Sequence, residues 1–297
     1  MNSTSQHLIA RYEIASAEGA SVTETTTATE THASTEKVFF PPTINSETIA
    51  HVGSFEIRNT LIMSWLTVLV LVIVAWRTRK TKYEMVPGKF QNFMETIIEG
   101  IFDFFQSVTQ NRKETKLFFG VCATIFLYII SSNWLGLLPG VGSIGIFEQH
   151  NGHEVLVPLL RSSYSDINMT LAIALISVVV TQFFGIMQLG AFHYLGKFFV
   201  NPFRDPIGCF VGLLEFVSEF AKIISFSFRL YGNIFAGDVL LAVMAFLLPF
   251  IAPIPFYGLE LFVGLIQALV FCLLTLVFMK MAATPHGEHE EHATTGA

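Results

Sequence analysis

Residues 206–250 read PIGCFVGLLEFVSEFAKIISFSFRLYGNIFAGDVLLAVMAFLLPF, an apolar segment that nevertheless contains charged side chains. As one unbroken helix it would be roughly 68 Å long at 1.5 Å per residue, about twice the ~30 Å hydrocarbon core of a bilayer. A helix of this length must tilt steeply or break. The charged residues inside the segment are Glu215, Glu219, Lys222, Arg229 and Asp238. Ionisable residues in membrane helices are costly, so we expect these to serve a function.

Four further stretches are apolar enough to be membrane helices. The whole chain is 52% hydrophobic and 13% charged, whereas soluble domains carry about 25% charged residues. Its mean hydropathy is +0.57. The stretches are residues 60–76, 117–138, 167–192 and 256–282, the last following an interruption at Pro253 and Pro255. The sequence therefore predicts an all-α, polytopic membrane protein with five membrane-inserted helices, and it excludes an ordinary soluble domain.

The distribution of basic residues predicts how the chain is oriented. Residues 77–89 read RTRKTKYEMVPGK, whereas the loop 139–165 carries a single basic residue, Arg161. Under the positive-inside rule the first of these segments is cytoplasmic. The N-terminus then lies outside, and five crossings leave the C-terminus inside. The N-terminal residues are acidic rather than Arg-rich, which argues against an organellar transit peptide and favours a bacterial inner membrane.

Residues 90–110 form an amphipathic segment between the first two spans. Apolar residues recur there at spacings of three and four, with acidic residues between them; the apolar positions are Phe90, Phe93, Ile97, Ile101 and Phe104. This pattern predicts one helix lying at the cytoplasmic interface. A connecting helix packed against the other helices fits the pattern equally well.

Polar tails flank the expected membrane domain, which covers residues 59–283. Residues 1–58 are expected to be a flexible tail outside the membrane and residues 284–297 a tail inside. The second tail contains His286, His289 and His292, for which we expect solvation rather than metal binding. We find no Walker or dinucleotide-binding motif, and we expect no cofactor, metal or nucleic-acid partner.

Most of the charges within 206–250 share one helix face. At about 100° per residue, the polar residues around Arg229 fall in a stripe about 80° wide; they are Glu215, Ser218, Lys222, Ser225 and Asn233. Glu219 lies at the margin of this stripe, and Asp238 lies on the opposite side of the helix. On the last helix Glu260, Gly264 and Gln267 also share a face, where a small residue allows close approach of another helix.

These residue types suggest how ions could cross the membrane. Arginine does not lose its proton in proteins, so Arg229 cannot relay protons, but it repels passing cations and attracts carboxylates. Asp238 and Glu260 can bind and release protons. Together they describe two access routes separated by a fixed positive charge. A proton would cross only on a mobile carboxylate, which a partner protein would have to supply.

Each of these residues also has a simpler interpretation. Arg229 could form an interhelical salt bridge with Glu219 or Asp238. Lys222 and Glu215 could extend to the cytoplasmic interface. Gln267 could make a packing hydrogen bond, and Glu260 could lie near the outer interface beside the proline turn. The sequence leaves these alternatives open.

The signature of one known family matches residues 225–238, which read SFSFRLYGNIFAGD. This run resembles the pattern S-x-x-x-R-L-x-G-N-x-x-A-G-[DE] of F-type ATP synthase subunit a. Two further stretches are similar to the same family: SNWLGLLPG at 132–140 and QALVFCLLTLVFMKMA at 267–282. The resemblance covers about residues 60 to 283 and does not include the long acidic N-terminal tail.

The resemblance implies a function and a role for each site residue. It implies a proton-translocating stator in which Arg229 faces a rotating c-ring and the last two long helices form a steeply tilted hairpin. Asp238 and Glu260 would line the half-channel from the outside, with Asn233 and Gln267 as polar neighbours. The family has either Glu or His at the position of Glu260. The route to the cytoplasm would pass Glu215, Ser225 and Lys222.

The implied partners are the c-ring, the peripheral stalk b subunits, the rest of the ATP synthase complex and the lipid bilayer. The chain would bind no nucleotide and catalyse no reaction alone. Two other function classes remain open, a self-contained channel or secondary transporter and a purely structural membrane subunit. We find no inverted repeat of the kind that many transporters contain. The sequence does not distinguish H⁺ from Na⁺.

Overall fold

The computed structural model of the chain describes residues 48–52, 55–80, 88–138, 140–141, 145–150, 153–158, 160–190, 194, 206–248 and 251–283. Within this part, five helices are long and apolar enough to cross a membrane. They are α2 (Asn59–Lys80), α4 (Arg112–Gly136), α5 (Ile167–Leu189), α7 (Pro206–Leu247) and α8 (Pro253–Ala283). Each coincides with a predicted apolar stretch, so the prediction of a polytopic helical membrane protein is confirmed.

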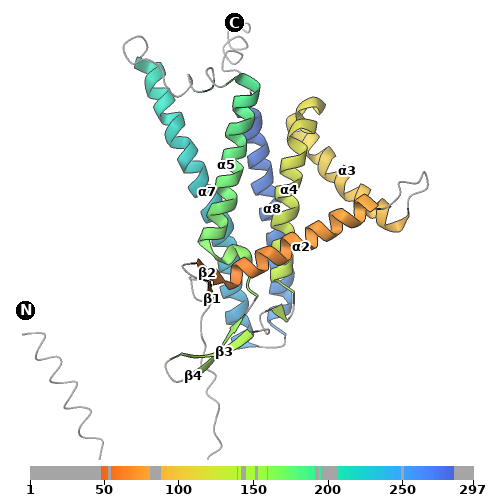
Figure 1. Ribbon diagram of the computed structural model, residues 1–297, viewed down its shortest axis with the longest axis vertical. Helices are drawn as coiled ribbons and strands as arrows, with labels where there is room; N and C mark the ends of the chain where they lie inside the picture. Colours follow the sequence, from red (N-terminus) through yellow and green to blue (C-terminus); the bar gives the residue numbers. More distant parts are fainter. Residues whose placement is uncertain are drawn as a thin grey trace, which may run out of the picture. The chain divides into compact units, whose positions relative to one another are not determined.

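Four of these helices form the centre of the membrane domain (Figure 1). α8 contacts α4, α5 and α7, and α5 also lies along α7. α2 contacts α4 and the short 3-10 helix η2 (Ser163–Ser165). The buried residues of α2 all lie within the first half of this helix, between Asn59 and Thr67. The rest of α2 therefore extends away from the four central helices.

α7 is a single uninterrupted helix of 42 residues. At 1.5 Å per residue it is about 63 Å long, so a tilt rather than a break must fit it to a bilayer. α8 begins at Pro253. Because the first turn of a helix needs no backbone N–H donors, Pro253 and Pro255 open α8 instead of separating it from α7. α7 and α8 form the predicted hairpin.

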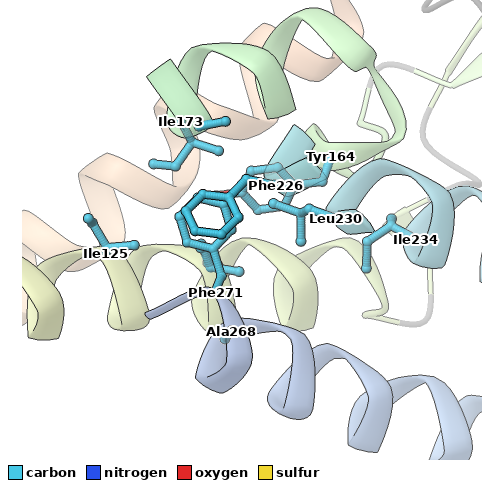
Figure 2. Packing of buried hydrophobic residues seen from close by; sticks show 10 residues of the cluster. Ile125, Tyr164, Ile173, Phe226, Leu230, Ile234, Ala268 and Phe271 are labelled. Atoms are coloured by element: carbon cyan, nitrogen blue, oxygen red, sulfur yellow. The ribbon is translucent and has the colours of Figure 1, made fainter. Parts of the chain in front are cut away.

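A cluster of buried side chains fixes the rotation of α7 (Figure 2). Phe226, Leu230 and Ile234, spaced four residues apart, all point into it. The rings of Phe226 and Phe271 of α8 have centroids 4.9 Å apart. The cluster also contains residues of the other packed elements: Ile125, Ile129, Tyr164, Ile173, Ala174 and Ala268. Residue 229, next to Leu230, is therefore turned away from this core.

The predicted amphipathic helix is α3 (Lys89–Thr109). It ends where Gln110 adopts a left-handed backbone conformation, φ 58°, and Asn111 caps α4 by accepting from the Lys113 N–H at 3.1 Å. Near its end, Phe105 is buried and Lys280 Nζ donates to the Thr109 carbonyl at 2.8 Å. Near its start, Phe90 and Phe93 are exposed. The second half of α3 is thus a connecting helix packed against other helices, which is one of the two alternatives that the sequence allowed.

Two short antiparallel hairpins were not predicted. β1 (Thr48–Val52) pairs with β2 (Phe55–Arg58), and β3 (Gly145–His150) pairs with β4 (His153–Pro158). β1 and β2 lie within residues 1–58, the segment expected to be a flexible tail, and their backbone groups are paired with each other. The predictions for residues 1–47 and for the tail 284–297 lie outside the described residues.

Candidate functional site

Arg229 lies on the exposed side of α7. Its Nη2 is 3.5 Å from Ser225 Oγ, one turn earlier on the same face. Among the described residues, no carboxylate forms an ion pair with Arg229. Within this part of the chain, the simple alternative of an interhelical salt bridge therefore has no support. The guanidinium instead faces outward from the packed helices.

The surface around Arg229 is apolar or small. Phe228 is 57% exposed, and Gly232 and Ala236 are also exposed on the following turns. Towards the start of α7, the exposed side chains of Ile207, Val211 and Leu214 continue this surface on the face of Arg229. In the described part of the chain nothing covers this surface, so it must face lipid or a partner protein.

Glu219 pairs with a residue other than Arg229. Its Oε1 accepts a hydrogen bond from Lys222 Nζ at 2.7 Å, one turn along α7. The Lys222 ammonium also lies 4.5 Å from the centre of the Phe278 ring of α8, a cation–π distance. Lys222 is therefore held between α7 and α8. It does not extend freely to the cytoplasmic interface, which was the simpler interpretation of the sequence.

Asp238 and Glu260 form a carboxylate pair where α7 and α8 cross. Glu260 is 5% exposed, and its carboxyl group lies directly against Gly237, where any added Cβ would overlap it. Glu260 and Asp238 interact electrostatically, and Asp238 also interacts with Arg161. Asp238 lies on the side of α7 opposite Arg229, as the helical period predicted. The two carboxylates are thus brought together away from the exposed guanidinium.

α4 approaches α8 closely beside Glu260, as the small residue Gly264 predicted. Asn133 Nδ2 donates to the Gly264 carbonyl at 3.2 Å, and Trp134 Nε1 donates to the Leu261 carbonyl, also at 3.2 Å. The last two predicted site residues, Asn233 of α7 and Gln267 of α8, are both half-buried. Their roles, like those of the other site residues, stay predictions.

A second cluster of polar side chains, the polar group around Tyr194, lies near the end of α5. Tyr194 is 3% exposed, its ring lies against Gly185, and its hydroxyl donates to Gln182 Oε1. Burial, with smaller contributions from the negative charges of Glu219 and Glu215, raises the pKa of Tyr194 to about 12. At neutral pH Tyr194 therefore remains a protonated hydroxyl and a hydrogen-bond donor. Glu215, predicted from the helical stripe, belongs to this group.

Sequence reasoning missed several residues of these two sites. The sequence predicts no role for Gln182 or Tyr194, and it predicts for Arg161 only an effect on orientation. A polar residue inside the apolar stretch 167–192 was a signal for Gln182, but nothing in the sequence places Tyr194 beside it. Asn133 lies within the motif SNWLGLLPG, but nothing in the sequence gives it a role.

Comparison with known proteins decides the family. A sequence model described as ATP synthase A chain matches residues 61–280, which include nearly all of the five long helices. The chain belongs to the ATP synthase A chain family. The resemblance inferred from the three sequence motifs is therefore confirmed, and Arg229, Asp238 and Glu260 all lie inside the matched region.

Curated relatives of this family align over most of the chain. ATP synthase subunit a of Syntrophobacter fumaroxidans is 34% identical over 243 residues, covering 80% of this chain and 90% of that protein. The protein of the same name from Gloeobacter violaceus is 34% identical over 234 residues, covering 78% and 86%. That from Desulfotalea psychrophila is 35% identical over 231 residues, covering 77% and 83%. These alignments cover 77–80% of this chain, in agreement with the match of the family model to residues 61–280.

Proposed function

We propose that this chain is the proton-translocating stator subunit of a rotary ATP synthase, a membrane subunit that catalyses no reaction by itself. Protons reach and leave a carboxylate on a ring of partner subunits through two offset half-channels. Arg229 lies between these half-channels and prevents a direct leak. Ion flux is thereby coupled to rotation of the ring.

The single observation that carries the proposal is the outward position of Arg229 on an apolar surface. A permanently charged guanidinium facing lipid is unfavourable by about 2.5–3.5 kcal/mol at the centre of a bilayer. A partner carboxylate would remove this cost, and Arg229 would favour the ionised form of that carboxylate as it passes. The exposed face of α7 around Arg229 therefore faces the ring.

Two routes on either side of Arg229 follow from the other polar groups. The carboxylate pair Asp238 and Glu260, with Asn233 and Gln267 nearby on the same helices, forms the half-channel from the outside. The polar stripe of Glu215, Lys222 and Ser225 forms the half-channel towards the cytoplasm. The two groups lie at different heights along α7 with Arg229 between them, and its permanent positive charge repels a proton that would pass directly from one group to the other.

The same proposal includes the orientation of the chain, its partners and its location in the cell. The N-terminus lies outside and the C-terminus in the cytoplasm, as the basic residues at the end of α2 indicate. The partners are the c-ring, the peripheral stalk b subunits and the remaining ATP synthase subunits. The location is a bacterial inner membrane, which agrees with the bacterial relatives named above.

Substitution of Arg229 in the assembled complex tests the proposal. Arg229→Ala is expected to abolish ATP-driven proton pumping in inverted membrane vesicles, while the complex still assembles and hydrolyses ATP. Phe228→Ala, on the same exposed face, is the matched control and keeps pumping measurable. Full pumping by the Arg229→Ala complex would refute the proposed mechanism.

Reconstitution distinguishes this function from that of a self-contained channel. The purified chain alone in liposomes is expected to conduct few protons under an imposed membrane potential, because the carrier carboxylate is missing. Addition of the ring and the other subunits restores coupled flux. Rapid conduction by the chain alone would favour the channel instead.

A further inference from the structure

The polar group around Tyr194 joins α5 to α7 beside the stripe that contains Arg229. Tyr194 packs its ring on Gly185 of α5 and is almost completely buried. Glu215 and Glu219, one turn apart on α7, both lie within electrostatic range of Tyr194. Gln182 of α5 accepts the Tyr194 hydroxyl proton in a hydrogen bond. Two polar surfaces, one on each helix, thus meet at Tyr194.

Two buried polar atoms in this group have no hydrogen-bond partner within the described structure. They are Gln182 Nε2, a donor, and Glu219 Oε2, an acceptor. The other polar atom of each side chain does have a hydrogen-bond partner. Gln182 Oε1 accepts from Tyr194, and Glu219 Oε1 accepts from Lys222. Buried polar atoms of native proteins are almost always paired, with ordered water where protein atoms are absent.

Water suits these two atoms better than a metal ion does. A water oxygen can accept from the Gln182 amide, and a water hydrogen can be donated to Glu219. A metal ion would meet the Gln182 N–H group and the Lys222 ammonium, which lies 2.7 Å from the other Glu219 oxygen. The site therefore matches neutral water or a proton carried by water.

We propose that Gln182, Tyr194 and Glu219 hold ordered water that carries protons between the polar stripe of α7 and the side of the membrane where α5 ends. This inference rests on the proposed function and adds α5 and Tyr194 to one of its half-channels. On the ring side an O–H bond of a hydronium ion breaks, which leaves water, and the released proton forms an O–H bond with the Glu219 carboxylate. That bond then breaks towards water on the Tyr194 side, and Glu219 returns to its carboxylate form.

Glu215 continues the same route. It lies four residues before Glu219, about 6 Å nearer the start of α7. Tyr194 lies within electrostatic range of both carboxylates, and the proposed route therefore continues from Glu219 to Glu215. The Tyr194 hydroxyl donates to Gln182 Oε1, which orients the Gln182 amide N–H groups towards the water.

Cysteine labelling in the assembled complex tests whether the site is hydrated. Gln182→Cys is made in a Cys209→Ala background, because Cys209 is the one native cysteine of the described residues that is not buried. Inverted vesicles, whose cytoplasmic face is outward, are treated with a charged, membrane-impermeant methanethiosulfonate. We expect Gln182→Cys to react at least about tenfold faster than Phe183→Cys, whose side chain lies 62% exposed on the outer face of α5.

Proton pumping by variants tests whether the water carries protons. Tyr194→Phe keeps the ring on Gly185 but loses the donor, and Glu219→Gln keeps the shape but loses the proton-binding group. Both are expected to reduce ATP-driven pumping about threefold or more at unchanged assembly, and Glu219→Asp is expected to restore most of it. A purely structural role would instead tolerate the isosteric Gln better than the shorter Asp.

The outcomes separate this inference from the proposed function. Equal labelling of Gln182→Cys and Phe183→Cys overturns the inference, as does labelling without any pumping defect in Glu219→Gln. Neither result affects the proposed function so long as Arg229→Ala abolishes pumping. Retained pumping by Arg229→Ala overturns the proposed function whatever the labelling shows.

Discussion

Gly237 of α7 and the carboxyl group of Glu260 of α8 are in direct contact, with no space for a side chain between them. Glu260 lies at the crossing of the two helices and is 5% exposed. The absence of a Cβ at position 237 thus lets a buried carboxylate lie against the backbone of α7. This places Glu260 next to Asp238, the following residue of α7.

Filling this space is expected to disturb the carboxylate pair. Gly237→Ala forces Glu260 or α8 to move, an overpacking cost of about 1–3 kcal/mol. A cost of about 1.4 kcal/mol, within this range, corresponds to a factor of ten. We therefore expect the rate of ATP-driven proton pumping to fall about tenfold. Fluorescence quenching in inverted vesicles measures the rate, and immunoblotting of the complex measures assembly.

Two further variants make this experiment specific. Gly258→Ala is the control, because a Cβ at position 258 of α8 meets nothing within 4 Å. It is expected to leave pumping unchanged. Glu260→Asp, combined with Gly237→Ala, shortens the side chain and is expected to recover part of the rate. Equal pumping by Gly237→Ala and wild type would show that the contact is not important for transport.

Asp238→Asn is expected to lower proton flux less severely than Arg229→Ala. The amide keeps the size of the side chain but cannot bind and release a proton, and Glu260 remains beside it. We expect a two- to fivefold reduction, about 0.4–1 kcal/mol on the rate scale. Proton flux is measured as a function of external pH, and an unchanged rate and pH profile would remove Asp238 from the route.

Lys280 is expected to stabilise the end of α3. Its ammonium donates to the Thr109 carbonyl, in the last turn of α3, where a positive charge also interacts favourably with the helix dipole. Lys280→Met removes this contact at a cost of about 1–2 kcal/mol. Hydrogen–deuterium exchange of residues 98–110 in the assembled complex should accelerate roughly 5- to 30-fold.

Lys116→Met is the control for this prediction. Lys116 is exposed on α4, and its loss removes the same charge near the same helix junction. Exchange in α3 is expected to stay at the wild-type rate. Similar acceleration in both variants would mean that net charge, rather than the hydrogen bond from Lys280, stabilises α3.

Substitution of Gly185 tests whether Tyr194 has a fixed position against α5. An added Cβ at position 185 would lie 2.5 Å from the Tyr194 ring and 3.2 Å from the Ala282 Cβ. Gly185→Ala is therefore expected to displace Tyr194 and to reduce pumping about as much as Tyr194→Phe does. Gly120→Ala, on α4 with nothing within 4 Å of its Cβ, should pump normally. Normal pumping by Gly185→Ala would argue against a fixed position of Tyr194.

Local patterns were sufficient to predict the helices and the faces of α7. Hydropathy depends only on a window of neighbouring residues, and the helical period separated Arg229 from Asp238 without any knowledge of contacts. The hairpin β3–β4 was missed although its strands are joined by Asn151 and Gly152, a dipeptide typical of two-residue turns. The signal was present but lay in a loop between two dominant apolar stretches.

Contacts between helices could not be predicted, because they depend on the relative register of distant segments. The contact of Gly237 with Glu260 requires the crossing point of α7 and α8. The hydrogen bond from Asn133 to Gly264 joins residues 131 positions apart. The burial of Tyr194 depends on where the chain returns after α5. No periodicity within one segment contains this information.

The outward position of Arg229 also has a consequence for how the protein is made in the cell. A newly synthesised copy that has not yet met its partner exposes a guanidinium and an uncovered apolar surface on the same helix. Because this surface is unfavourable without a partner, we expect membrane proteases to degrade such a copy. We therefore expect the supply of partner subunits to set the cellular amount of this chain, with surplus copies degraded and no dedicated sensor of stoichiometry required.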